Sequence, residues 1–256
     1  MIHPTAIVSS RATIGARVSI GPFCCIGDKV TIGDDCQLDS HVVIEGPTTI
    51  GNSNRFFPFC VIGVQPQDLK FRGEDTFLTI GSNNQFREYV NVHRGTKGGG
   101  GHTRVGDHNF VMVAAHIAHD CIVGNHIIMA NAATLAGHVT IEDHATIGAF
   151  SGVHQFCRVG RYGYVGGYSV ITKDVLPYSK TVSDRNTQAY GVNAIGLERK
   201  GFTDDQIRNI KSAFRLLLQS KLNTSQAVEA IRQQASVPEV EVLLEFIGSS
   251  TRGVTK

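Results

Sequence analysis

The stretch SIGPFCCIGDKVTIGDDC, residues 19–36, has an isoleucine at every sixth position: Ile20, Ile26 and Ile32. Apolar residues continue at this spacing in both directions, with one shift of a single residue before Val105. A period of six fits neither an amphipathic helix nor a half-buried strand. The other in-phase positions are Ile2, Val8, Ile14, Leu38, Ile44, Ile50, Phe56, Ile62, Ile80, Phe86, Val92, Val105, Val111, Ile117, Val123, Met129, Leu135, Ile141, Ile147, Val153, Val159, Val165 and Ile171.

A repeat of six predicts a parallel β-helix of triangular section, mainly β in class. Each hexapeptide forms one short side, its apolar residue points inward, and glycine helps the chain turn the corner. Three sides make a coil of 18 residues, since the prism has three faces. Residues 18 apart should therefore stack at the strand spacing of ~4.8 Å.

Five of the six cysteines follow an inward apolar residue by four positions: Cys24, Cys36, Cys60, Cys121 and Cys157. Small apolar residues fill the same position elsewhere in the repeat. We therefore expect buried, reduced thiols that act as small hydrophobic side chains. This interpretation removes Cys121 from any metal site.

Two segments interrupt the repeat, near residues 63–79 and 94–104, and we expect loops there. The repeat ends near Leu176, so the predicted domains are a β-helix over residues 1–182 and a helical domain over 183–256. In the second domain, Thr203 and Gln206 form a predicted capping box at the start of one helix. Two further helices should begin near Thr224 and after residues 236–238.

Composition excludes some functions. The net charge is +2, which does not call for a nucleic-acid partner. No window reaches the ~18 unbroken apolar residues of a membrane span, and the first residues do not form a signal peptide. The sequence thus predicts a cytoplasmic protein.

Polar residues concentrate in AAHIAHDCIVGNH, residues 114–126. The six-residue repeat places His119 and Asp120 outward, near a corner. Asp120 should stack on His138, which lies 18 residues later, and His119 should share a column with Gln155. A candidate cluster follows: His116, His119, Asp120, His138, His154 and Gln155. His126 should lie on another edge, in a stack with His108 and His144.

Three interpretations of this cluster remain open. It is a solvated corner that tolerates histidine, a metal site, or an acid–base site. We favour the third, with no metal or other cofactor, because His119 and Asp120 supply a base and the carboxylate that fixes its tautomer. His138, Gln155 and the amide of Gly137 could donate to an oxyanion. No nucleophile is evident, so the acceptor's own hydroxyl would attack after His119 removes its proton.

The motifs QPQDLKF, VNVHRGT, AHIAHDC, HQFC and GLERKGF occur in this order. With the hexapeptides, they make the chain similar to the UDP-N-acetylglucosamine O-acyltransferases that begin lipid A synthesis in Gram-negative bacteria. The resemblance implies a left-handed parallel β-helix with a small helical C-terminal domain, and a cytoplasmic homotrimer with active sites between subunits. It also implies transfer of an R-3-hydroxyacyl chain from acyl carrier protein to the 3-position of the UDP-amino sugar.

The same resemblance implies roles for individual residues. His119 is the general base, Asp120 orients it, and the Gly137 amide serves the thioester oxyanion. A small residue at Gly167 leaves the acyl groove long. The implied substrate-binding residues are Gln67, Asp68, Lys70, His116, His138, His154, Gln155, Asn193, Arg199 and Lys200.

Three other functions compete with this one. The N-acyltransferase of the same pathway normally carries an additional N-terminal domain, whereas the hexapeptides here begin at Ile2. A zinc-dependent trimeric β-helix with hydratase chemistry would use the histidines as ligands, and a non-catalytic scaffold would show no turnover. The sequence leaves open the acyl chain length and whether the acceptor is a 3-hydroxyl or a 3-amino sugar nucleotide.

Overall fold

The computed structural model describes residues 1–182, 189, 191–234, 237–250 and 254. The chain divides into two compact units, Met1–Ser183 and Asp184–Lys256. The predicted domain boundary after residue 182 adjoins residues 183–188, which lie outside the described residues.

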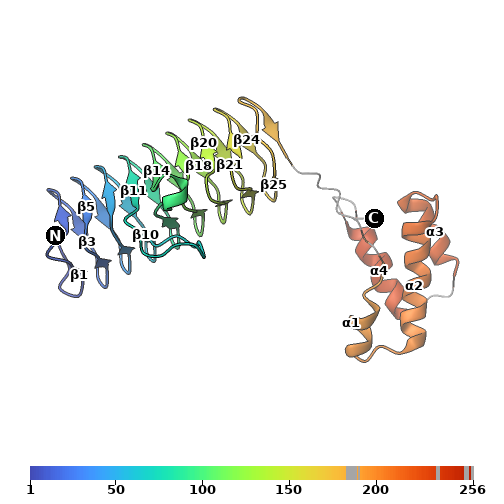
Figure 1. Ribbon diagram of the computed structural model, residues 1–256. Coiled ribbons are helices and arrows are strands. Elements are labelled where there is room, and N and C mark those ends of the chain that lie inside the picture. Colours follow the sequence, from blue (N-terminus) through green and yellow to red (C-terminus); the bar gives the residue numbers. More distant parts are fainter. Residues whose placement is uncertain (183–188, 190, 235–236, 251–253, 255–256) are drawn as a thin grey trace. The chain divides into compact units, whose positions relative to one another are not determined.

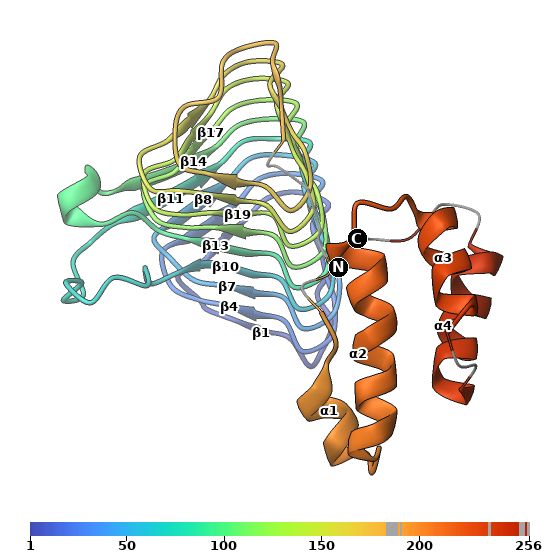
Figure 2. The ribbon, with the colours of Figure 1, turned by 90° about the vertical axis from the view of Figure 1, so that its right-hand side faces the viewer.

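The first unit is a left-handed parallel β-helix whose three sheets form the sides of a prism, as predicted (Figures 1 and 2). The first sheet contains β1 (Ile7–Val8), β4 (Cys25–Ile26), β7 (Val43–Ile44), β10 (Val61–Val64), β13 (Asn91–His93), β16 (His116–Ile117), β19 (Thr134–Leu135), β22 (Gly152–Val153) and β25 (Val170–Ile171).

The second sheet contains β2 (Thr13–Ile14), β5 (Val30–Ile32), β8 (Thr48–Ile50), β11 (Phe77–Ile80), β14 (His102–Val105), β17 (Ile122–Val123), β20 (Thr140–Ile141) and β23 (Arg158–Val159). The third contains β3 (Ser19–Ile20), β6 (Gln37–Leu38), β9 (Arg55–Phe56), β12 (Gln85–Phe86), β15 (Phe110–Val111), β18 (Ile128–Met129), β21 (Thr146–Ile147), β24 (Tyr164–Val165) and β26 (Lys180–Thr181).

The interior of the prism is filled by the in-phase apolar residues. Those from Ile20 to Ile171 are buried, while Ile2 in the first coil is half exposed. The five cysteines that follow an inward apolar residue by four positions are buried and free, as predicted. Burial raises the pKa of Cys60 and of Cys121 to about 12, so both remain neutral thiols near pH 7.

Corner residues stack from coil to coil. At most regular corners one non-glycine residue has a positive φ, for example Asp120 at 60° and His138 at 63°. The rings of His108, His126 and His144 lie parallel, with centroids 4.8 and 4.7 Å apart. This stack occupies the corner between the second and third sheets, away from Asp120, as the sequence predicted.

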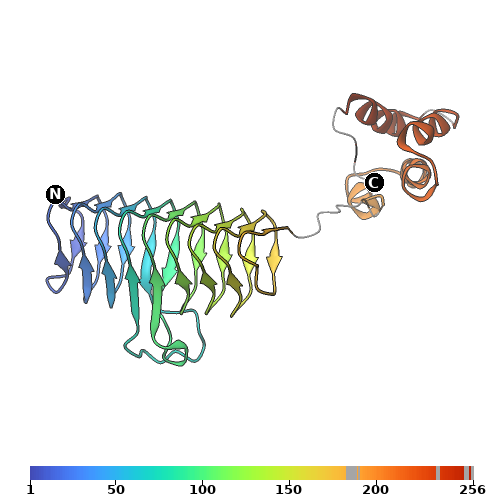
Figure 3. The ribbon, with the colours of Figure 1, turned by 90° about the horizontal axis from the view of Figure 1, so that it is seen from above.

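Two loops project from the corner between the first and second sheets (Figures 2 and 3). The first loop, residues 65–76, joins β10 to β11, and the second loop, residues 94–101, joins β13 to β14. Leu78 pairs with Thr48, 30 residues earlier instead of 18, so the first insertion equals two hexapeptides and preserves the phase. Asn91 pairs with His116, 25 residues later, and the seven extra residues shift the phase by one.

The second unit contains four helices in its described residues: α1 (Ala194–Arg199), α2 (Asp204–Gln219), α3 (Thr224–Arg232) and α4 (Pro238–Ser249). The predicted capping box of Thr203 and Gln206 begins α2. The sequence did not indicate α1, whose six residues are too few to show a helical period. In the described part of the chain, none of the helices has the length and apolar character needed to span a bilayer.

Candidate active site

A cavity of about 880 Å³ opens at the corner that carries the two loops. The first loop contributes Gln67, Asp68 and Lys70, and the second loop contributes Thr96. The coils contribute His119, Gly137, His138, Gln155 and Phe156. Seven residues that the sequence assigned to the site therefore line one cavity, although they come from four different coils.

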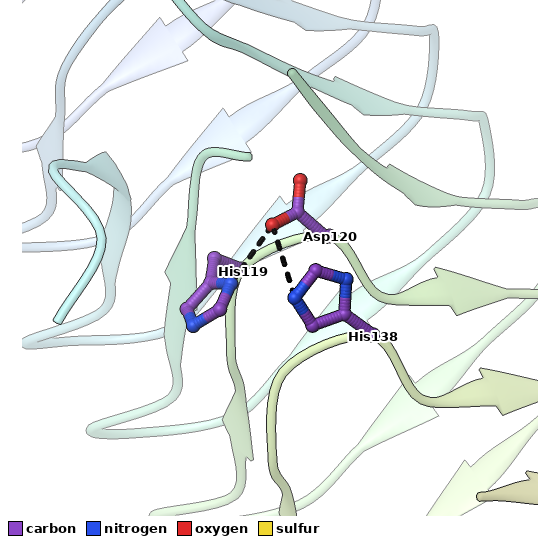
Figure 4. Close-up of side chains that lie close together, drawn as sticks. All are labelled: His119, Asp120 and His138. Atoms are coloured by element: carbon purple, nitrogen blue, oxygen red, sulfur yellow. Dashed lines mark hydrogen bonds and ion pairs between the residues drawn. The ribbon is translucent and has the colours of Figure 1, made fainter. Parts of the chain in front are cut away.

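His119 lines the cavity and is hydrogen-bonded to the buried Asp120. His119 Nδ1 lies 2.8 Å from Asp120 Oδ2 (Figure 4). The Asp120 side chain is almost fully buried. Burial acts to raise the pKa of Asp120, but the hydrogen bonds from His119 and Thr96 outweigh it and hold that pKa below its usual value. Because the carboxylate is ionised, Nδ1 carries the proton and Nε2 is left as the basic nitrogen.

His138 completes this group from the next coil. Its amide donates to the His119 carbonyl at 3.0 Å, and its Nε2 lies 3.8 Å from Asp120 Oδ2. Both histidine rings face the same carboxylate in Figure 4. The ring of His138 stacks on Phe156, with centroids 4.5 Å apart. Sequence reasoning missed Phe156, although its position 18 residues after His138 could have indicated it.

Gly137 leaves space for the His119 ring. A Cβ at residue 137 would lie 2.5 Å from His119 Cε1 and 2.8 Å from Nε2. Within the described residues, the Gly137 amide makes no hydrogen bond. A free N–H beside a basic nitrogen is suited to bind a developing negative charge.

Other predicted site residues lie outside this cavity. His116 is half-buried on the outer face of β16, and its Nδ1 is 3.0 Å from Asn91 Oδ1. His154 is exposed, next to Gln155, and its Nδ1 is 3.2 Å from the Gln155 carbonyl. Gly167 lies at the corner after β24, where a Cβ would be 3.0 Å from the Ala149 carbonyl oxygen.

Three predicted residues belong to the second unit. Asn193 caps α1 and accepts a hydrogen bond from the Gly196 amide at 3.2 Å. Arg199 is the last residue of that helix, and Lys200 is its C-cap. Asn193 therefore lies at the start of α1, and Arg199 and Lys200 lie at its end.

His93 is a buried histidine that sequence reasoning did not single out. It is 2% exposed, and its ring meets that of His116 edge-on at 5.0 Å. Its Nδ1 has no hydrogen-bond partner among the described residues. Burial, and then the proximity of His116, His119 and Arg94, lower the pKa of His93 to about 4. His93 is thus a buried, neutral ring that packs against His116.

The low pKa of His93 makes stability depend on pH. In the unfolded chain a histidine titrates near ~6.5, so between pH ~6.5 and 4 only the unfolded state takes up this proton. The free energy of unfolding should therefore fall with decreasing pH in this window, by up to ~1.4 kcal/mol per pH unit for this group. His93→Phe should lessen that slope. Denaturant titrations at several pH values and equal protein concentration measure it, and identical slopes would refute the assignment.

Comparison with known proteins places the chain among the β-helical acyltransferases. The acyl-[acyl-carrier-protein]–UDP-N-acetylglucosamine O-acyltransferase of Thermodesulfovibrio yellowstonii is 47% identical over 256 residues, covering 100% of this chain and 99% of its own. The enzyme of that name from Syntrophobacter fumaroxidans has the same identity and coverage. The solved structure of LpxA from Acinetobacter baumannii is 44% identical with a TM-score of 0.71, covering 100% of this chain and 99% of its own.

A further match comes from the family description "Udp N-acetylglucosamine O-acyltransferase; Domain 2", which fits residues 174–255. The chain belongs to the UDP-N-acetylglucosamine O-acyltransferase family. The resemblance inferred from the motifs is thereby confirmed.

Proposed function

We propose that this enzyme transfers an R-3-hydroxyacyl group from acyl carrier protein to the 3-position of UDP-N-acetylglucosamine or its 3-amino analogue, as the first step of lipid A synthesis. His119 acts as the general base. The observation that carries this role is the hydrogen bond between the cavity-lining His119 and the buried Asp120, with Nδ1 and Oδ2 2.8 Å apart. The names of the relatives supply the donor and the acceptor.

The chemistry follows from the tautomer. The Asp120 carboxylate holds the proton on Nδ1, so Nε2 accepts the proton of the sugar hydroxyl as the oxygen attacks the thioester carbonyl. A C–O bond forms, and the C–S bond breaks when the tetrahedral intermediate collapses. The imidazolium then returns the proton to the leaving thiolate. Asp120 stabilises the imidazolium without taking its proton, as in other histidine–carboxylate pairs.

The other residues that the sequence assigned would bind the two substrates. The amide of Gly137 would bind the oxyanion, and His138 and Gln155 would contact the sugar from the adjacent coils. Gln67, Asp68 and Lys70 would reach the nucleotide sugar and the acyl chain from the first loop. Asn193, Arg199 and Lys200 would bind UDP and the phosphopantetheine arm. Gly167 would leave room for a longer acyl chain, and His116 and His154 would add polar contacts.

We further propose a cytoplasmic homotrimer with active sites between subunits. The outer face of the first sheet supports this assembly, because several of its outward residues are apolar: Ile7, Val43, Val61 and Val170. Exposed aromatic rings line the adjoining corner, namely Phe23, Phe59, Tyr89, Phe150 and Tyr168. Exposed apolar and aromatic side chains gathered on one side of a protein are typical of an interface between proteins.

One observation favours the zinc-dependent alternative. Among the described residues, His119, Asp120 and His138 place their ligand atoms within 4.8 Å of one another. Three ligands with one open position are typical of catalytic zinc. The separation of 3.8 Å between His138 Nε2 and Asp120 Oδ2 nevertheless requires these side chains to approach before one ion is bound.

The experiment measures the rate of acyl transfer by the purified enzyme from a series of R-3-hydroxyacyl carrier thioesters to each of the two sugar nucleotides. Each rate is measured before and after treatment with chelator. We expect transfer to one of the sugar nucleotides and the same rate after metal analysis shows no bound zinc. Activity that disappears with the metal and returns with added zinc would favour the hydratase-like site. No turnover with any carrier thioester would contradict the proposed function.

A further inference from the structure

The second loop and the strand that follows it make three hydrogen bonds to Asp120. The Thr96 amide donates to Asp120 Oδ1 at 2.8 Å, and the Thr96 hydroxyl donates to Oδ2 at 2.6 Å. Beyond the other end of the loop, the hydroxyl of Thr103 accepts from the Asp120 amide at 2.8 Å. Thr96 and Thr103 are both buried. The loop and its strand are thus tied to the backbone and to the carboxylate of one residue.

The direction of the Thr96 hydroxyl is itself fixed. Its oxygen accepts a hydrogen bond from the Gly99 amide at 3.1 Å, in the single turn Lys97–Gly99 that Thr96 caps. The hydroxyl proton is therefore free to point at Asp120 Oδ2. That same oxygen accepts from His119 Nδ1, so the loop and the base share one acceptor.

Gly99 brings the loop against the carboxylate. A Cβ at this position would lie 2.1 Å from both Cγ and Oδ2 of Asp120, a separation that requires something to move. At the neighbouring Gly98, a Cβ would meet no atom within 4 Å. The close approach therefore distinguishes Gly99 from the glycine beside it.

An ordinary corner between the first and second sheets needs no such loop. Four residues, 118–121, join β16 to β17, whereas eight residues, 94–101, join β13 to β14 in the coil before Asp120. At the same corner position of regular coils, Lys29 and Phe156 are exposed and His138 is half-buried. The extra residues therefore both bury the Asp120 carboxylate and supply it with donors. A buried charge needs such hydrogen bonds to remain ionised and in place.

We infer that Thr96 is a positioning residue for the reaction: with Gly99, it clamps the Asp120 carboxylate in the orientation that holds His119 with Nε2 toward the substrate. This inference rests on the proposed function. Both loops line the cavity. The second loop thereby has the additional role of orienting the general base through Asp120.

The test compares Thr96→Val, which removes the hydroxyl at nearly constant volume, with Thr96→Ser, which retains it. We expect kcat to fall about tenfold or more in Thr96→Val, as for loss of a hydrogen bond to a charged group, with KM for the sugar nucleotide little changed. Thr96→Ser should recover most of the activity. Thr31→Val, which removes an exposed hydroxyl on β5, is the matched control and should behave as the wild type.

A double-mutant cycle separates positioning from a structural effect. If Thr96 acts through Asp120, Thr96→Val should lower kcat no further in a protein that already carries Asp120→Ala. A purely structural role predicts the same loss in both backgrounds and would overturn the inference, as would wild-type kcat in Thr96→Val. A wild-type enzyme without turnover would instead refute the proposed function.

The two glycines give an independent comparison. Gly99→Ala should be at least tenfold less active than Gly98→Ala, because only the first places a methyl group on the carboxylate. Equal activities would contradict the clamp. Circular dichroism and thermal unfolding of both variants check that the β-helix is intact, and a Gly99→Ala protein that fails to fold leaves the Thr96 cycle as the deciding measurement.

Discussion

Replacement of His119 by alanine should lower kcat/KM by about a thousandfold or more, because general-base catalysis contributes ~10²- to 10⁴-fold. The variant removes the only imidazole whose Nδ1 bonds the buried Asp120 within the described residues, and no other described side chain offers a basic nitrogen in the same position. Turnover is measured with hydroxyacyl carrier protein and UDP-N-acetylglucosamine. Light scattering should show the same assembly mass as the wild type, since the exposed aromatic rings that we propose for the interface line a different corner of the prism.

His126→Ala is the matched control. His126 is also a corner histidine, but it stacks between His108 and His144 on a different edge. Its replacement should leave turnover near the wild-type value. Near-normal turnover in His119→Ala would remove the base from the mechanism, and an equal loss in both variants would indicate a general effect of corner histidines on the fold.

The six-residue period was enough to predict the β-helix and the interior. An inward residue at every sixth position determines which side chains are buried, so the repeat alone assigns Cys121 to the core. The same period gives the neighbours of each corner residue 18 positions away. It therefore predicted that His138 adjoins Asp120 and that His126 lies elsewhere, and the structure shows both.

The period could not predict what the loops contribute. Insertions of twelve and seven residues leave the repeat, so no count of hexapeptides places Thr96 against Asp120 or Gln67 in the same cavity. Gln67 was assigned through the family resemblance alone. Thr96 and His93 were missed because their roles depend on burial and on hydrogen bonds across 24 residues or a ring contact across 23.

A regular coil and an irregular loop thus play different parts in this site. The coil fixes the backbone of Asp120 and His138, each in a left-handed corner conformation that recurs along the edge. The loop adds donors that a repeat of two-residue strands cannot provide. Catalytic precision of this kind depends on rigid placement, since displacement of a reacting group by ~1 Å costs about a hundredfold in rate.

Gly137→Ala applies such a displacement directly. The new methyl group would lie 2.5 Å from His119 Cε1, so the ring must move, and its bond to Asp120 Oδ2 limits how it can do so. We expect kcat/KM to fall by about a hundredfold. Gly27→Ala is the control on the same edge, because there a Cβ would lie an ordinary 3.5 Å from its nearest neighbour. Its activity should match that of the wild type.

The variant also distinguishes two roles of residue 137. Alanine retains the backbone amide, so an oxyanion donor at this position survives the substitution while the base is displaced. If the loss arises from the His119 ring, then Gly137→Ala should add nothing to His119→Ala. If the two losses multiply instead, the methyl group disturbs the amide or the substrate itself. In that case the space at Gly137 serves the thioester and not the base.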